Sequence, residues 1–204
     1  MTFLAVAATA GCRVGGPSRS SDAYDGPVES CAVGCHGDRA SPAPPLGLAG
    51  ETATTEPAVG AHRIHLATSD WRGRVACEDC HRVPGDVGDP LHVDLERPAE
   101  LTWSDLANDR GALSPEYVQG ADPASRACSG VYCHGATLDG GSNTTPLWTL
   151  VDGTQAACGT CHGLPPPAPH PPAASGCGCH RNVTPTLGFR DPALHIDGDV
   201  DVDF

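Results

Sequence analysis

Five times in this sequence a cysteine is followed directly by a histidine, and a second cysteine stands shortly before each pair. With 11 Cys and 10 His among 204 residues, fewer than one Cys-His dipeptide is expected by chance. The pattern C-x-x-C-H is the attachment signature of haem c, in which two cysteines form thioethers to the porphyrin and the histidine binds its iron. The sequence therefore predicts a chain that folds around several covalently bound haem groups.

The spacing between the cysteines differs among the five motifs. Two residues separate the cysteines at 77–81 and 158–162, which is the spacing of the haem signature. Three residues intervene at 31–36 and four at 128–134, so the additional residues must bulge from the helical turn between the thioethers. The predicted thioether cysteines are Cys31, Cys35, Cys77, Cys80, Cys128, Cys133, Cys158, Cys161, Cys177 and Cys179. The predicted proximal iron ligands are His36, His81, His134, His162 and His180.

The motif at 177–180 has a single residue between its cysteines, which leaves little chain to span the two vinyl carbons of a haem. Gly176 or Gly178 can let the backbone contort there, because glycine has no Cβ. Otherwise only Cys179 is bonded and Cys177 remains a free thiol. The sequence thus predicts five haem c groups, or four if this site is not loaded.

Five histidines lie outside the motifs, the same number as the predicted irons, and these are His62, His65, His92, His170 and His195. The only methionine is Met1, so methionine ligation is excluded in a processed chain and bis-histidine ligation is predicted. Ordinary surface histidines are the alternative for this set. The sequence does not assign each histidine to its iron.

The two halves of the chain repeat one order of features: two haem motifs, a free histidine between them, and a Leu-His-[Val/Ile]-Asp tail. By this repeat His170 corresponds to His62 or His65, and His195 corresponds to His92. The unmatched histidine is assigned to the additional 128–134 motif or to the first haem. The predicted divisions are a signal segment at 1–11, a tether at 12–30, a two-haem module at 31–108 and a three-haem module at 126–204.

The composition is poor in residues that build a core. Leu, Ile, Val and Phe make up 35 of the 204 residues, and the formal net charge is −13, a combination typical of disordered chains. Covalently held porphyrins would supply the missing apolar core. The predicted fold class is mostly irregular, with few short helices, little strand and a haem-dominated core. We expect single helical turns at the motifs, one longer helix near 97–108 and a short edge strand within 195–204.

The first residues resemble an export signal. A short apolar segment ends in Thr9-Ala10-Gly11-Cys12, which is similar to the lipobox of bacterial lipoproteins with Cys12 as the lipidated residue, although no basic residue precedes it. A plain secretory signal is the alternative. The expected location is the periplasm, the outer membrane or the cell surface, with membrane attachment through the lipid. The acidic balance argues against nucleic acid as a partner.

Close cysteine pairs also occur in disulfide frameworks and in zinc sites. Neither alternative explains why histidine follows the second cysteine in all five motifs. Zinc sites combine two C-x-x-C pairs, and adjacent Cys and His residues rarely both reach one tetrahedral ion. Ten cysteines serve five haems, and the eleventh is Cys12, so the haem interpretation accounts for every cysteine.

One stretch resembles a known family. The stretch consists of Cys128-SGVY-Cys133-His134-Gly135, Trp148, Cys158-GT-Cys161-His162-Gly163-LPP and His170. It is similar to the CxxxxCH/CxxCH family of multihaem cytochromes from metal-reducing bacteria. The resemblance implies an exported electron carrier, often a lipoprotein, that serves respiratory electron transfer to metals or redox partners. The single-residue spacing at 177–180 and the short chain depart from the family pattern.

Three functions are weighed against one another. The leading hypothesis is an electron carrier without catalysis, which exchanges electrons with redox partner proteins such as other cytochromes and with a metal or mineral acceptor. The second is a multihaem reductase with one open iron, which the supply of a distal histidine for every motif disfavours. The third is a haem-free exported module held together by disulfides or zinc.

Overall fold

The computed structural model describes residues 37, 47, 49–84, 88–90, 92, 99–171, 177–200 and 202. The predicted signal segment and tether, the lipidation site and the first haem motif lie outside the described residues. The site residues concerned are Cys12, Cys31, Cys35 and His36.

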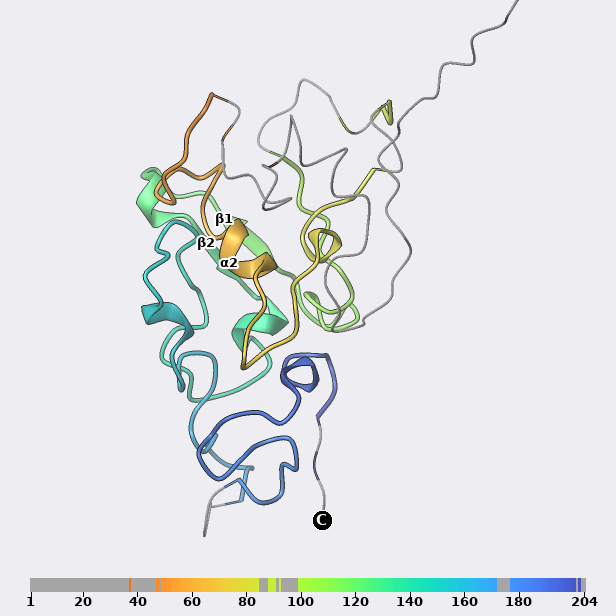
Figure 1. Ribbon diagram of the computed structural model, residues 1–204, viewed down its shortest axis with the longest axis vertical. Coiled ribbons are helices and arrows are strands. Elements are labelled where there is room, and N and C mark those ends of the chain that lie inside the picture. Colours follow the sequence, from red (N-terminus) through yellow and green to blue (C-terminus); the bar gives the residue numbers. More distant parts are fainter. Residues whose placement is uncertain are drawn as a thin grey trace, which may run out of the picture.

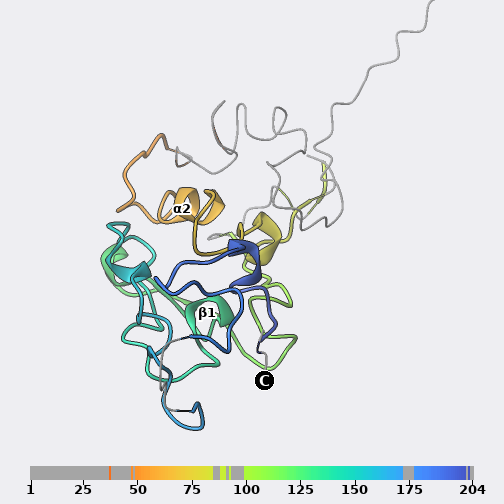
Figure 2. The same cartoon turned by 60° about the horizontal axis from the view of Figure 1, so that its bottom comes forward.

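Regular structure in the described chain is short. The helix α2 covers His62–Leu66, and two strands, β1 at Glu116–Val118 and β2 at Ala127–Ser129, pair antiparallel with Tyr117 opposite Cys128. The remaining elements are 3-10 turns: η1 at Cys77–Asp79, η2 at Pro123–Ser125, η3 at Tyr132–His134, η4 at Thr154–Ala156 and η5 at Pro192–Leu194. Coil connects all of them (Figures 1 and 2). The predicted fold class, mostly irregular with few short helices and little strand, is confirmed.

The longer helix expected near 97–108 is not formed in its described part, 99–108, so this prediction is wrong. The backbone N–H groups of Thr102 and Ser104 donate to the carbonyl oxygens of Cys80 and Asp79, at 3.0 and 3.1 Å. Trp103 between them has a φ of 35°, in the left-handed region that a right-handed helix excludes. Hydrogen bonds to the second haem motif therefore replace the intrahelical ones that the pattern suggested.

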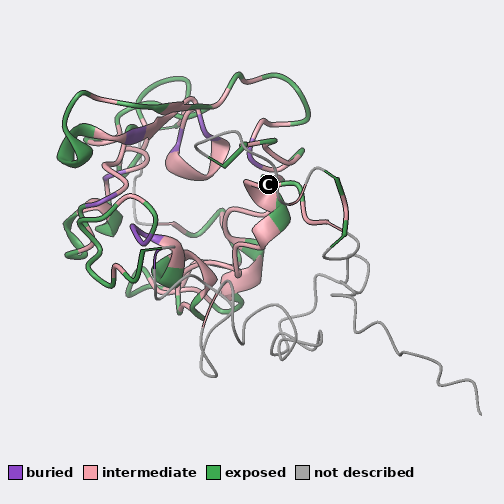
Figure 3. Ribbon diagram, turned by 90° about the horizontal axis from the view of Figure 1, so that it is seen from above, coloured by how far each residue is buried: buried purple, intermediate pink, exposed green. Residues whose placement is uncertain are grey.

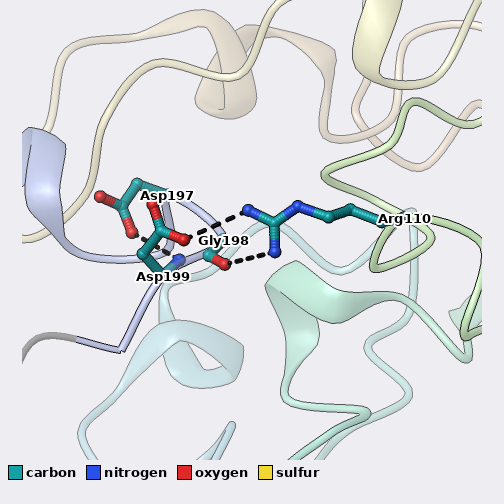
Figure 4. A network of polar contacts seen from close by, with 4 residues as sticks. All are labelled: Arg110, Asp197, Gly198 and Asp199. Carbon is teal, nitrogen blue, oxygen red and sulfur yellow. Dashed lines mark hydrogen bonds and ion pairs between the residues drawn. The ribbon is translucent and has the colours of Figure 1, made fainter.

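The edge strand expected near the C-terminus is also not formed within the described residues 195–200. This segment is held instead by Arg110, whose guanidinium donates to the carbonyl oxygen of Gly198 at 3.1 Å and to the carboxylate of Asp199 at 3.2 Å (Figure 4). The backbone N–H of Asp199 donates to the carboxylate of Asp197 at 3.1 Å. Side-chain contacts therefore fix a tail that the alternating Val and Asp pattern assigned to a sheet.

The side-chain core is small. Among the described residues the buried hydrophobic ones are Val59, Ala61, Ala107, Ala127 and Val131, and no large side chain is fully buried. Buried segments are correspondingly few and short in Figure 3. The hydrophobic effect of five small side chains cannot order a chain of this length. The described side chains therefore form only a small core, and the haem-dominated core expected from the sequence remains a prediction.

Close backbone contacts join the motifs at 128–134 and 158–162. The N–H groups of Ser142 and Asn143 donate to the carbonyl oxygens of Gly159 and Thr160, at 3.0 and 2.9 Å. Gly135 lies so near this segment that a Cβ at its position would be 1.9 Å from the carbonyl oxygen of Cys161. The loop after His134 thus lies directly against the next haem motif. None of the helices in the described ranges is long and apolar enough to cross a membrane.

Candidate functional site

Short turns present the cysteines of two motifs as expected, whereas Cys128 lies in strand β2 and no helical turn forms over 158–162. In η1 the N–H of His81 donates to the carbonyl oxygen of Cys77 at 2.8 Å, and the carboxylate of Asp79 accepts a hydrogen bond from the N–H of Ala76 at 2.9 Å. At 177–180 the N–H of His180 donates to the carbonyl oxygen of Cys177 at 2.9 Å. These turns bring two cysteines and the following histidine to one side of the chain, which is the arrangement that a covalently attached haem needs.

Each proximal histidine that the structure describes faces one of the predicted distal histidines. The ring centroids are 6.2 Å apart for His62 and His81, 6.2 Å for His65 and His134, 6.5 Å for His162 and His195, and 6.2 Å for His170 and His180. The remaining distal candidate is His92, whose backbone N–H donates to the carbonyl oxygen of Asp89 at 2.9 Å. The structure thus groups eight of the ten predicted iron ligands into four facing pairs.

The helix α2 supplies two of these histidines. His62 and His65 are three residues apart and therefore share one face of the helix. They nevertheless face different motifs, 77–81 and 128–134. Two of the predicted haem sites are consequently neighbours that depend on one short helix.

Most of the paired imidazoles use one ring nitrogen for a hydrogen bond to the backbone. Nδ1 lies 2.8–3.0 Å from a carbonyl oxygen in His62, His65, His81, His162 and His170, and Nδ1 of His195 is bonded to the carbonyl oxygen of Trp71. Such a bond fixes the proton on Nδ1 and leaves Nε2 free to bind a metal. The ring orientations therefore suit iron ligation.

Burial keeps several of these imidazoles neutral. It lowers the pKa of His62 and of His134 to about 4, from an ordinary value near 6.5. Burial also lowers the pKa of His65 and of His195. A neutral imidazole is the form that binds a metal ion, so these residues are ready to ligate at neutral pH without losing a proton.

Three of the motif cysteines have buried thiols. Burial, together with nearby acidic groups, raises the pKa of Cys80 and of Cys133 to about 12, and burial raises that of Cys128 to about 11. These thiols are therefore uncharged at neutral pH, as the sulfur of a haem thioether is. The eight described cysteines form no disulfide, and the described residues contain no group of three or more metal-ligating side chains.

Aromatic side chains surround the histidine pairs. Trp148 contacts both histidines of α2, with ring centroids 4.7 Å from His62 and 5.8 Å from His65, and its indole N–H donates to the carbonyl oxygen of Pro57 at 2.7 Å. Phe189 stacks on His195 at 4.1 Å. The sequence placed Trp148 in the family pattern but gave it no role. Phe189 carried no signal in the sequence.

Two buried nitrogen atoms have no hydrogen-bond partner among the described residues: Nε of Arg126 and Nδ1 of His134. Both residues flank or belong to the motif at 128–134. A buried donor without a partner costs free energy unless a bound group satisfies it. The guanidinium of Arg126 suits a haem propionate, so the residues of this segment fit a bound haem.

Comparison with protein families identifies this same segment. Residues 127–162 match the Geobacter CxxxxCH...CXXCH motif family. The match spans the motifs at 128–134 and 158–162 and confirms the resemblance drawn from the sequence. The CxxxxCH...CXXCH motif indicates a multihaem c-type cytochrome with covalently bound haem c. The chain matches no curated protein and no solved structure.

Proposed function

We propose that this protein is an exported pentahaem c-type cytochrome that carries electrons through bis-histidine haems in a respiratory or extracellular electron-transfer chain. The observation that carries the proposal is the set of four facing imidazole pairs. The family match supports haem binding at two of the motifs, and the pairs extend the same interpretation to the motifs at 77–81 and 177–180.

The separation within each pair is the one that a shared iron requires. A metal–imidazole bond is about 2.0 Å long and the ring centroid lies about 1.1 Å behind the bonding nitrogen, so two trans imidazoles have centroids about 6.2 Å apart. The four observed separations are 6.2–6.5 Å. The space between the rings is therefore consistent with a porphyrin plane.

The internal repeat supports a fifth haem site at the first motif, 31–36. In the second half the free His170 faces the second motif, and the tail histidine, His195, faces the first motif. In the first half the free histidine His62 likewise faces the second motif. The same rule assigns the tail histidine His92 to His36. The unmatched His65 faces His134 in the additional motif.

Electron transfer is favoured over catalysis because every described proximal histidine has a distal partner. A reductase that activates a small anion needs an iron with an open coordination position, and the facing pairs leave none at the four described motifs. Bound haem supplies one-electron chemistry. The chain holds the rings, keeps water from the buried imidazoles and brings neighbouring sites together.

The proposed partners are redox proteins such as other cytochromes, with a metal or mineral as the terminal acceptor. The proposed location is the periplasm, the outer membrane or the cell surface, with attachment through lipid on Cys12. No nucleic-acid partner is expected from a chain with a formal net charge of −13.

Haem content and spin state test the proposal. The full chain would be produced with a cytochrome c maturation system, and intact mass with a pyridine haemochrome assay would count its haems. We expect five haems in the wild type and four in a Cys177→Ala/Cys179→Ala variant, with a low-spin ferric spectrum throughout. His170→Ala should convert one haem to the high-spin form. A colourless protein would refute haem binding, and cyanide binding or a high-spin signal in the wild type would refute the pure carrier.

A further inference from the structure

His134 differs from the other imidazoles in its hydrogen bonding. Its Nδ1 is buried and has no partner among the described residues. By contrast, both imidazoles facing each other at the 77–81 motif bond a backbone carbonyl oxygen through Nδ1, and so do both at the 158–162 motif. At the 128–134 motif only the distal His65 has such a bond, to the carbonyl oxygen of Ala61 at 2.8 Å.

This hydrogen bond controls how strongly an imidazole donates electrons to iron. When Nδ1–H donates to a carbonyl oxygen, the ring gains imidazolate character and becomes a more basic ligand. A more basic axial ligand stabilises ferric over ferrous iron and lowers the reduction potential. Only one of the two imidazoles at the His134 site has an Nδ1 hydrogen bond to a carbonyl oxygen, whereas both imidazoles have one at each neighbouring site. Its ferric form is therefore the less stabilised.

The surroundings of His134 act in the same direction. Two of the few buried side chains of the described structure belong to this segment: Ala127 just before the motif and Val131 within it. Ferric haem carries one more positive charge than ferrous haem, and burial disfavours the charged state. Charged side chains of both signs lie near the motif, Asp79 on one hand and Arg72 and Arg126 on the other. Their effects on the haem offset one another in part, so ligand hydrogen bonding and burial decide the order.

The same site lies between two others. The helix α2 carries both His65 of this site and His62 of the 77–81 site, and a Cβ at Gly135, next to His134, would lie 1.9 Å from the carbonyl oxygen of Cys161. These contacts place the 128–134 haem near the 77–81 haem and near the 158–162 haem. An electron that arrives at either neighbour therefore has this haem within reach.

We propose that the haem bound by Cys128, Cys133 and His134 has a higher reduction potential than the haems of the 77–81 and 158–162 motifs and holds the first electron that enters this group. The proposal rests on the proposed function, because it requires bis-histidine haems at these motifs. One electron from a reduced donor protein converts this iron from ferric to ferrous, and neither neighbouring iron changes its state. The protein would then store an electron at an interior haem and pass on the later ones.

The ring geometry separates the haem bound by His134 from the others by its spectroscopic signature. The interplanar angle is 18° for His62 and His81, 51° for His65 and His134, 84° for His162 and His195, and 10° for His170 and His180. Nearly parallel axial imidazoles give a ferric haem a rhombic EPR signal, and nearly perpendicular ones give a highly anisotropic signal. The His65–His134 haem should therefore show an intermediate signal that separates it from the others.

An EPR-monitored redox titration of the mature, haem-loaded full chain tests the proposal, with dithionite as the reductant. We expect the intermediate signal to disappear first, before the highly anisotropic signal and before the rhombic signal, which is recorded in the Cys177→Ala/Cys179→Ala variant so that the 177–180 haem does not contribute to it. Loss of the intermediate signal together with or after either of these would overturn the proposal.

Two variants secure the assignment of the signals. His65→Ala removes a ligand from the site, so the intermediate low-spin signal should be replaced by a high-spin one. Cys31→Ala/Cys35→Ala removes the haem of the first motif and clears any signal that it contributes. If His65→Ala fails to fold, the wild-type titration still decides the order of reduction. Failure of the proposed function would look different, as a wrong haem count or the absence of low-spin signals.

Discussion

Gly60→Ala should disturb two haem sites through one contact. Gly60 immediately precedes the N-cap of α2, has a φ of +40° and packs against the indole of Trp148. A Cβ at this position would lie 2.0 Å from the indole nitrogen, a distance that no side chain tolerates without movement. Because Trp148 contacts both His62 and His65, either the indole or the start of α2 must shift.

The cost of this substitution has two parts. Placing alanine in the left-handed region costs about 1–2 kcal/mol, and forcing extra volume against a packed ring costs about 1–3 kcal/mol, so a total of about 2–5 kcal/mol is expected. Gly50→Ala is the matched control, because Gly50 has a φ of +90° and nothing within 4 Å of the added Cβ. The control should lose only the backbone part, about 1–2 kcal/mol.

Guanidinium denaturation of the haem-loaded full chain would measure the free energy of unfolding of both variants, with unchanged m-values as the check on two-state behaviour. EPR of the ferric Gly60→Ala protein should show altered signals for the His81 and His134 haems and an unaltered signal for the haem between His162 and His195. Equal destabilisation by the two substitutions would refute the steric reasoning. A change confined to one of the two haems would refute the idea that α2 couples them.

Three further predictions follow from individual contacts. Gly135→Ala should lower the free energy of unfolding by about 2–5 kcal/mol, because its Cβ would lie 1.9 Å from the carbonyl oxygen of Cys161. It should also reduce haem loading at the two adjoining motifs, 128–134 and 158–162, and intact mass would detect that loss. Trp148→Phe keeps an aromatic ring but loses the indole hydrogen bond to a backbone carbonyl, so denaturation should show a loss of about 1 kcal/mol. Arg110→Ala breaks an ion pair with Asp199 in which both side chains are more than half exposed, so the loss in denaturation should stay below about 1 kcal/mol and shrink at high salt.

The sequence predicts a set of candidate ligands but not their arrangement. The motif pattern and the number of free histidines predict two cysteines and two histidines for each haem, and the family match supports the pattern at 128–162. The pairing of histidines with irons was left open, although the repeat carried a usable signal. Once the second half pairs its free histidine with its second motif, the first half can be expected to do the same with His62 and His81.

The longer helix was mispredicted because local pattern and tertiary contacts disagree there. Pro, an acidic residue and an apolar face over 97–108 favour a helix in isolation. In the structure the N–H groups of Thr102 and Ser104 bond the motif at 77–81, and the carbonyl of Glu100 accepts from Nδ1 of His81 at 3.0 Å. Supporting a ligand needs backbone polar groups that are free to bond another segment and are not paired within a helix. Periodicity cannot reveal such a demand, because it arises from a residue far away in the sequence.

The helix α2 shows why chain and cofactor must order together. A helix of five residues is far below the length of about 12–15 residues at which isolated helices become marginally stable in water. It has no side-chain cap, and its residues are half-buried, as His62 and His65 are, or exposed. What holds it are contacts of His62 and His65 with Trp148 and with the histidines of two motifs. If iron joins each facing pair, two metal bonds anchor α2 to motifs that begin 11 or more residues after it. On the proposed function, the short helix would position two haems, and the two haems would in turn provide the free energy that keeps so short a helix folded.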